Sequence, residues 1–266
     1  MATVNVSIMP AVFVGHGNPM ITLEDNLYTR GWQQLGRELP RPRAILTISA
    51  HWYAPTRRVS TTDFPSTIHD FFGFPKKLFQ VEYPAPGSPE LAERVLELLS
   101  EDGFERDGQR GLDHGAWSVL RHLYPEADIP VIQLSIDLRM SPEEHFRLAQ
   151  KLAPLRDEQI LVLASGNLVH NLMAYNWHNR QIAPPEWAVE FESWNRTQFS
   201  SGTPKRLTDY LSSGKMAEWS APTPDHYLPA LYLAALQRPE DRVTFPLEGF
   251  DGGSMLMLSV VLSSGD

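Results

Sequence analysis

The sequence contains no cysteine among its 266 residues. Its absence excludes disulfides, iron–sulfur clusters, thiolate zinc sites and a cysteine nucleophile. A metal ion bound by this chain would therefore need histidine, aspartate or glutamate as ligands. Imidazole ligands suit zinc, iron, copper or nickel.

Long apolar runs and blocks of like charge are also missing. The apolar stretch at 255–262 is far shorter than the about 20 residues that cross a membrane. The first residues show neither the basic segment nor the apolar run of a signal peptide. The net charge of −9, without a block of like charges, argues against nucleic acid or an anionic membrane as a partner. We therefore expect a soluble, cytoplasmic protein.

Short apolar runs alternate with helical patterns along the chain. This alternation predicts one α/β domain over residues 1–266, with a central, mostly parallel or mixed sheet flanked by helices. Buried strands are predicted at 11–14, 44–49, 130–136 and 159–165, and a closing strand pair at 242–248 and 254–262. Helices are predicted at 88–100 and 141–154, and within 184–201 and 223–236.

Several motifs of common enzyme classes do not occur. The glycines of "GHGNPM" at 15–20 lack the GxGxxG spacing of a dinucleotide site, and no phosphate-binding GxxxxGK[ST] loop is present. The absence of GxSxG weakens the hypothesis of a serine hydrolase.

Three of the nine histidines, His16, His51 and His170, stand just beyond predicted strands. The carboxyl ends of strands in an open α/β sheet border the ligand crevice. Glycine flanks His16 and His114, which lets backbone approach a bound ion closely. A mononuclear catalytic site needs about three protein ligands. The spacing favours His16, His51 and one of His170 or His226, the last at the start of a predicted helix.

A single histidine after a strand is more often a structural residue than a ligand. That interpretation suits four others: His69, His122, His145 and His178. His145 stands beside two glutamates on a predicted helix, so we expect it to face solvent. Three strand-end histidines in one chain are harder to explain as coincidence, and they favour a metal site.

Six segments together resemble one known family. They are "GHGNPM" (15–20), "SAHW" (49–52), "HDFFGFP" (69–75), "GLDHGAWSVL" (111–120), "SGNLVHNL" (165–172) and "PTPDHYLPALY" (222–232). In this order they resemble the extradiol ring-opening dioxygenases of the LigB superfamily. Within it, the chain is most similar to the branch of the bacterial 4,5-DOPA extradiol dioxygenases, which is related to the plant betalain enzymes. The resemblance covers nearly the whole chain.

The resemblance implies a role for each of five histidines. His16, His51 and His226 would hold the metal ion. His170 would act as acid–base catalyst or as a fourth ligand, and His114 would line the substrate pocket. Well-known members carry a glutamate as third ligand, whereas this chain resembles a three-histidine branch.

Neighbouring side chains leave two interpretations open. Asp225 precedes His226, and because adjacent helix residues point in different directions we give the ligand role to His226. Trp52 either walls the pocket or packs in the core. Phe71, Phe72, Phe74 and Tyr227 are candidates for an aromatic wall.

The implied reaction opens a catechol, here a DOPA-like one, beside its hydroxyls and inserts both atoms of O₂. Fe(II) would be the active metal because zinc has no redox chemistry, although zinc also fits such ligands. The substrates would be a small catechol and O₂. Two alternatives remain: a zinc hydrolase or amidase on the same ligands, and a non-catalytic relative that binds a peptide partner.

Overall fold

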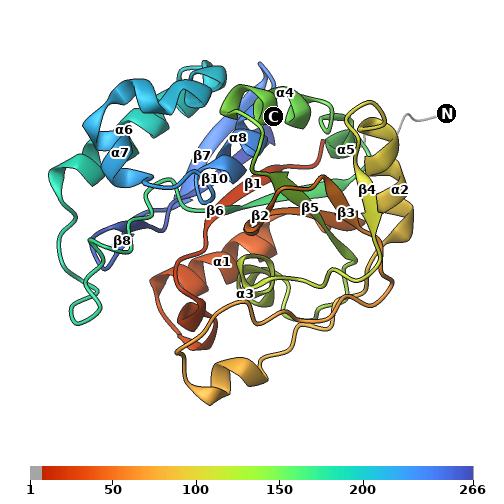
Figure 1. Cartoon of the computed structure of the whole chain (residues 1–266), viewed down its shortest axis with the longest axis horizontal. Helices are drawn as coiled ribbons and strands as arrows, with labels where there is room; N and C mark the ends of the chain where they lie inside the picture. Colours follow the sequence, from red (N-terminus) through yellow and green to blue (C-terminus); the bar gives the residue numbers. More distant parts are fainter. Residues whose placement is uncertain (1–7, 266) are drawn as a thin grey trace.

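The computed structural model of the chain describes residues 8–265 (Figure 1). An eight-stranded mixed sheet runs through its centre. Four parallel strands form the middle of this sheet, and the strand next to them on each side runs antiparallel to them. In spatial order the strands are β4 (Glu105–Asp107), β3 (Arg58–Ser60), β5 (Val131–Asp137), β2 (Ala44–Ala54), β6 (Ile160–Gly166), β1 (Ala11–Gly15), β10 (Ser259–Ser264) and β7 (Asp241–Leu247).

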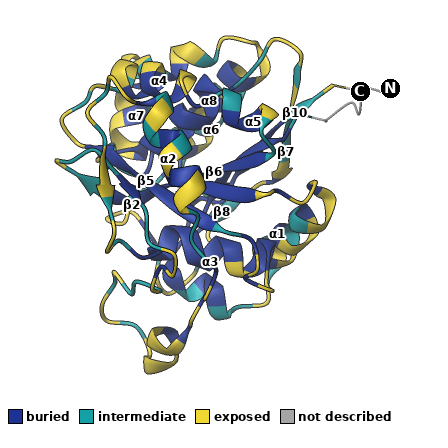
Figure 2. Ribbon diagram, turned by 90° about the vertical axis from the view of Figure 1, so that its right-hand side faces the viewer, coloured by how far each residue is buried: buried dark blue, intermediate teal, exposed yellow. Residues whose placement is uncertain are grey.

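Both faces of the sheet are buried under helices, which explains why its strands read as continuous apolar runs. Successive residues of β1 point to opposite faces: Phe13 joins one core cluster, and Val12 and Val14 join the other. Figure 2 shows the buried strands between the two helical layers. One layer holds α1 (Leu27–Glu38) and α3 (His114–Leu123), and the other holds α4 (Pro142–Gln150), α5 (Pro154–Asp157), α6 (Glu186–Ser200), α7 (Lys215–Ser220) and α8 (Leu228–Ala235).

The remaining elements are short or lie at the edges. Helix α2 (Pro89–Leu98) packs its apolar residues into the cluster that contains Phe13. The 3-10 helices are η1 (Pro19–Leu23), η2 (Lys76–Gln80) and η3 (Pro204–Ser213), and a separate hairpin is formed by β8 (Phe250–Asp251) and β9 (Met255–Leu256). No helix within residues 8–265 is long and apolar enough to span a membrane.

Two predicted helices begin where a serine precedes a proline. Ser88 accepts a hydrogen bond from the backbone N–H of Leu91 at the start of α2. Ser141 and Glu144 form a capping box at the start of α4. These caps and the central strands confirm the predicted α/β fold with its mixed sheet.

Three boundaries differ from those predicted. Strand β2 continues to Ala54, so His51 lies inside the strand, where its register against β5 shifts between Ile48 and Tyr53. Helix α8 begins only at Leu228, which leaves His226 in the turn before it. The stretch 254–262 is split between β9 and β10 rather than continuous.

The expectation that His145 faces solvent is wrong. Helix α4 packs against α8, and this contact turns the His145 side chain inward, where it is fully buried. Its Nδ1 lies 3.0 Å from the Tyr232 hydroxyl. Burial lowers the pKa of His145 to about 4.

The buried His145 predicts a loss of stability in mild acid. The unfolded chain takes up a proton near the ordinary pKa of 6.5, whereas the folded chain does so only near 4. Burial of His145 therefore costs no unfolding free energy above pH 6.5, and its cost grows as the pH drops toward 4. Between about pH 7 and pH 5 the wild type should lose about 2 kcal/mol of unfolding free energy that a His145→Gln variant keeps. Urea unfolding at both pH values measures the difference, and equal losses in the two proteins would contradict it.

Candidate metal centre

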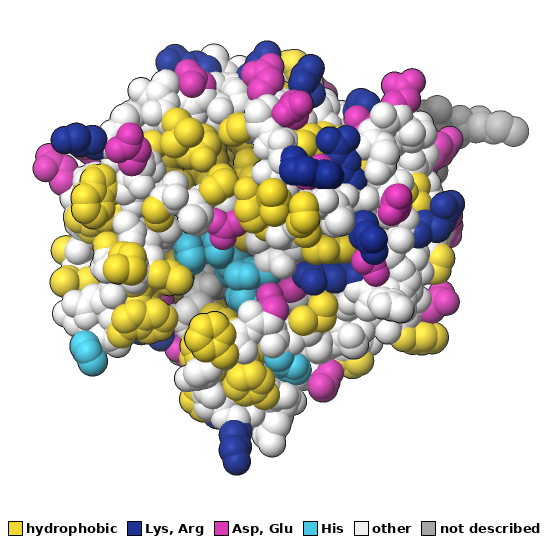
Figure 3. Space-filling model, in the orientation of Figure 1, with side chains coloured by type: hydrophobic (Ala, Val, Ile, Leu, Met, Phe, Trp, Pro, Cys, Tyr) yellow, Lys and Arg dark blue, Asp and Glu magenta, His cyan; other side chains and the backbone are white. Residues whose placement is uncertain are grey.

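The five histidines singled out from the sequence meet at one edge of the sheet, from five different segments. His16 follows β1 directly, and His51 lies in the irregular part of β2. His170 comes shortly after β6, where its backbone N–H donates to the Ser220 carbonyl. His114 is the first residue of α3, and His226 lies in the turn before α8. In Figure 3 histidine side chains gather in a depression at the middle of one face, rimmed by hydrophobic side chains.

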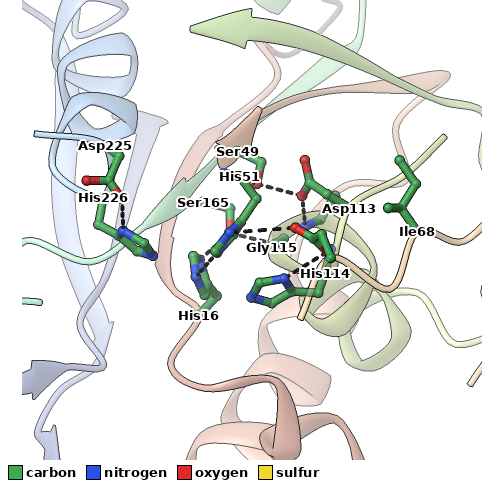
Figure 4. Close-up of polar contacts among 12 residues, drawn as sticks. His16, Ser49, His51, Ile68, Asp113, His114, Gly115, Ser165, Asp225 and His226 are labelled. Atoms are coloured by element: carbon green, nitrogen blue, oxygen red, sulfur yellow. Dashed lines mark hydrogen bonds and ion pairs between the residues drawn. The ribbon is translucent and has the colours of Figure 1, made fainter. Parts of the chain in front are cut away.

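His16, His51 and His114 form a group that could hold a metal ion. One nitrogen of each ring lies within 4.8 Å of the other two. The Nε2 atoms of His16 and His51 face each other at 3.1 Å (Figure 4). This distance suits either a hydrogen bond between the two rings or two nitrogens directed at one cation.

His226 completes a second triangle with the same two histidines. Its ring centroid lies 5.3 Å from that of His16 and 5.0 Å from that of His51, and the His16 and His51 centroids are 5.0 Å apart. His114 is less evenly placed, because its centroid lies 3.7 Å from that of His51. His170 stacks on His226, with centroids 3.5 Å apart and planes within 5°.

Two hydrogen bonds of the Ser165 hydroxyl set the tautomer of His16. The Ser165 hydroxyl donates to the Gly115 carbonyl at 2.6 Å. Since a hydroxyl has one proton, Ser165 Oγ must accept from His16 Nδ1, which lies 3.0 Å away. The lone pair of His16 is therefore on Nε2, the atom that faces His51.

Two carboxylates orient other histidines of the cluster. Asp225 Oδ2 lies 2.5 Å from His226 Nδ1, and Asp70 Oδ1 lies 2.9 Å from His114 Nδ1. The other Asp70 oxygen is 3.6 Å from His51 Nδ1. Ligand histidines commonly pass their second N–H to such a carboxylate, which fixes the ring and raises its basicity.

The protonation states suit a bound cation. Burial, reinforced by repulsion from neighbouring histidines, holds the pKa of His16, His51 and His170 well below the ordinary value. These rings are neutral at physiological pH and keep the free lone pairs that metal binding requires. Burial alone would raise the pKa of Asp70 and Asp225, but the hydrogen bonds from His114 and His226 outweigh it and lower both. Two anions thus flank the neutral rings.

Some of the aromatic residues expected to wall the pocket lie beside the histidines, and others belong to the core. The Phe71 ring lies 5.6 Å from that of His114, and Phe74 packs against Phe71 at 5.5 Å. Phe72 is 91% exposed. Tyr227 belongs to the core, where it is fully buried and donates to Asn195 at 2.8 Å. Trp52 is buried beneath the guanidinium of Arg110, 4.8 Å from the ring centroid.

Sequence reasoning missed two polar residues of the cluster, Asp70 and Ser165, and misjudged a third. Asp70 stands in "HDFFGFP" and Ser165 in "SGNLVHNL", so both were within segments already noted. Asp225 was expected to point away from His226. Because both residues lie in a turn rather than in a helix, their side chains instead meet.

The part of the chain that carries the five histidines is similar to known proteins. A family model described as the catalytic LigB subunit of aromatic ring-opening dioxygenase matches residues 11–240, a range that contains all five histidines. The 4,5-DOPA dioxygenase extradiol of Escherichia coli K12 is 48% identical over 256 residues, which cover 95% of this chain and 94% of that protein. The protein of the same description from Beta vulgaris is 37% identical over 255 residues, covering 94% of each.

A solved structure shares the fold. The crystal structure of an uncharacterized protein from Escherichia coli K12 superposes with a TM-score of 0.84 at 44% sequence identity. The superposition covers 96% of this chain and all of that one. The sheet that brings the five histidines together is therefore an arrangement that this chain shares with an experimentally determined protein.

Proposed function

The chain belongs to the LigB family of aromatic ring-opening dioxygenases, and we propose that it opens a DOPA-like catechol by 4,5-extradiol cleavage with O₂. The product would be a ring-opened semialdehyde. The convergence of five histidines is the observation that carries this proposal: burial keeps the rings of His16, His51 and His170 neutral, and carboxylates orient His114 and His226. The names of the relatives support the choice of substrate.

LigB dioxygenases use a metal ion, and the ring spacing supports His16, His51 and His226 as its ligands. Rings bound through nitrogen to one tetrahedral ion at about 2.0–2.1 Å have centroids about 5 Å apart. The triangle of 5.0, 5.0 and 5.3 Å agrees with that spacing. The His51–His114 separation of 3.7 Å is too short for two such ligands, so we give His114 a place in the substrate pocket.

We propose Fe(II) as the active metal. When bound, it would supply a Lewis acid for the two catechol oxygens and a path for electrons to O₂, which zinc, lacking redox chemistry, cannot provide. Zinc would still fit the three imidazoles, because affinity alone does not select iron. The cysteine-free donor set is consistent with either ion.

His170 is the proposed acid–base group. Burial keeps its ring neutral, so it can accept a proton from a catechol hydroxyl. Stacking on His226 places it beside a proposed ligand, where the reacting hydroxyl would lie. The negative charge of Asp225 would favour the protonated ring that results and so help it return the proton later.

His114 would orient the substrate. Asp70 accepts from its Nδ1, so its Nε2 carries a lone pair that can accept a hydrogen bond from a substrate hydroxyl. Phe71 lies edge-on to this ring and would meet the face or edge of the aromatic substrate.

We infer that the catalytic domain takes in the whole chain, residues 1–266, beyond the matched range. Strand β10 pairs with β1, which ends at Gly15, directly before His16. In addition, the N–H of Gly15 donates to the Leu258 carbonyl at 2.9 Å. Leu258 and strand β10, which lie beyond residue 240, therefore support the position of a proposed ligand.

The metal proposal predicts which ion restores activity. Metal-free protein should be inactive toward L-DOPA. Anaerobic loading with Fe(II) should then give O₂ uptake equal in amount to the DOPA consumed, and loading with Zn(II) should give none. An oxygen electrode and mass spectrometry of the product make the measurement. Equal turnover with zinc and no oxygen consumption would favour a zinc hydrolase on the same ligands instead.

A further inference from the structure

The backbone of His51 is held by side chains rather than by the sheet. In β2, residues 50–52 have no partner in the registers of the neighbouring strands β5 and β6. The His51 N–H donates instead to Ser49 Oγ at 3.2 Å. The His51 carbonyl accepts from Arg110 Nη2, also at 3.2 Å.

Both of these side chains are bound to one carboxylate, that of Asp113. Ser49 Oγ donates to its Oδ1 at 2.6 Å, and Arg110 Nη2 donates to its Oδ2 at 2.8 Å. Gln133, on β5, anchors the group to the sheet. Its Nε2 donates to Oδ2 at 2.8 Å, and its Oε1 accepts from the Asp113 N–H at 2.9 Å. The Asp113 side chain is fully buried.

The same carboxylate also begins helix α3, whose first residue is His114. Asp113 is the N-cap and accepts from the Ala116 N–H at 3.2 Å. The helix lies so close to β2 that a Cβ on Gly115 would be 2.4 Å from Ser49 Oγ and 3.0 Å from His51 Cδ2. One group, the Asp113 carboxylate, thus supports the positions of both His51 and His114.

We propose that Asp113 is a positioning residue that sets the placement of His51 as a metal ligand and of His114 toward the substrate. The inference rests on the proposed function. A carboxylate offers about four acceptor positions, and four donors occupy them here: Ser49, Arg110, Gln133 and the N–H of Ala116. Asparagine has one acceptor oxygen, so its amide N–H groups would face donors and the arrangement would have to shift.

The test uses Co²⁺, which binds nitrogen and oxygen sites more tightly than Fe²⁺ does and reports ligand geometry in its visible spectrum. In Asp113→Asn the dissociation constant for Co²⁺ should rise about 10–100-fold, the usual effect of losing a residue that orients a ligand. The Co²⁺ spectrum should change, and kcat of the iron-loaded protein should fall by a similar factor.

A matched control separates positioning from general loss of stability. Asp241 forms a fully buried pair with Arg156 at 2.6 and 2.7 Å, among residues outside the histidine cluster. Asp241→Asn should destabilise the fold but keep the wild-type Co²⁺ spectrum and affinity. An Asp113→Asn protein that behaves like Asp241→Asn in these two respects would overturn the proposal.

A milder variant covers the case in which Asp113→Asn does not fold. Ser49→Ala removes only the link from Asp113 to the His51 N–H. It should weaken Co²⁺ binding and alter the spectrum, and an unchanged spectrum and affinity would overturn the proposal. Wild-type protein that binds no Co²⁺ would instead overturn the proposed metal site, and the role of Asp113 with it.

Discussion

The His51→Ala variant is expected to lose its tightly bound metal ion and, with it, ring-opening activity. The Nε2 of His51 faces that of His16 at 3.1 Å, so its removal leaves two proposed ligands instead of three. The loss of affinity should exceed the about 10–100-fold that removal of an outer partner causes. Metal analysis after gel filtration, together with O₂ uptake on L-DOPA, measures both effects.

Another histidine provides the control for this variant. His178 is exposed, and the prediction for His178→Ala is wild-type metal content and rate. Full metal occupancy in His51→Ala would show that the ion is held elsewhere, and the ligand assignment would have to be abandoned.

Replacing His170 with alanine should separate proton transfer from metal binding. The variant should keep most of its iron, because His226 remains oriented by Asp225. Its kcat should fall by about 10²–10⁴-fold, the usual contribution of a positioned proton-transfer group. The limb of the pH–rate profile that belongs to this histidine should vanish as well.

Two other outcomes for His170→Ala would change the account. A parallel loss of iron and rate would make His170 a fourth ligand. Full iron with near-normal ring cleavage would make it a structural residue, and the proton route described above would be wrong. His170→Gln, which keeps a polar side chain but cannot carry the proton, should be as slow as the alanine variant.

The central strands and the capped helices could be predicted because their signals are local. Apolar runs identified the four parallel strands, and a serine before a proline identified the starts of α2 and α4. The clustering of His16 and His170 also follows from the sequence, since each stands after a parallel strand and such strands end at one edge of the sheet.

The position of His51 could not be predicted in the same way. Its backbone leaves the sheet register because of contacts with Arg110 and with Ser49, and through them with Asp113. These contacts join segments about 60 residues apart in the chain, so no short window contains them. Asp113 is the N-cap of α3, a helix that was not predicted from the sequence, and nothing local indicated that this cap also reaches β2.

The sequence contains a signal for the burial of His145, but the two neighbouring glutamates were given more weight. Two adjacent glutamates suggested solvent, yet Leu148 and Ala149 follow at three and four residues and are both buried. Residues at these spacings share one face of a helix. The face that packs on α8 therefore includes His145, and helical periodicity was the better guide there.

Incorporation of ¹⁸O₂ tests the central claim most directly. Iron-loaded protein is mixed with L-DOPA under ¹⁸O₂ in ordinary water, and the product is analysed by mass spectrometry with rapid quenching to limit exchange with water. A metal-dependent extradiol dioxygenase should give a ring-opened product that carries both labelled atoms. A product without label, or with its added oxygen taken from water, would contradict the assignment of this histidine cluster to oxygen-dependent ring opening.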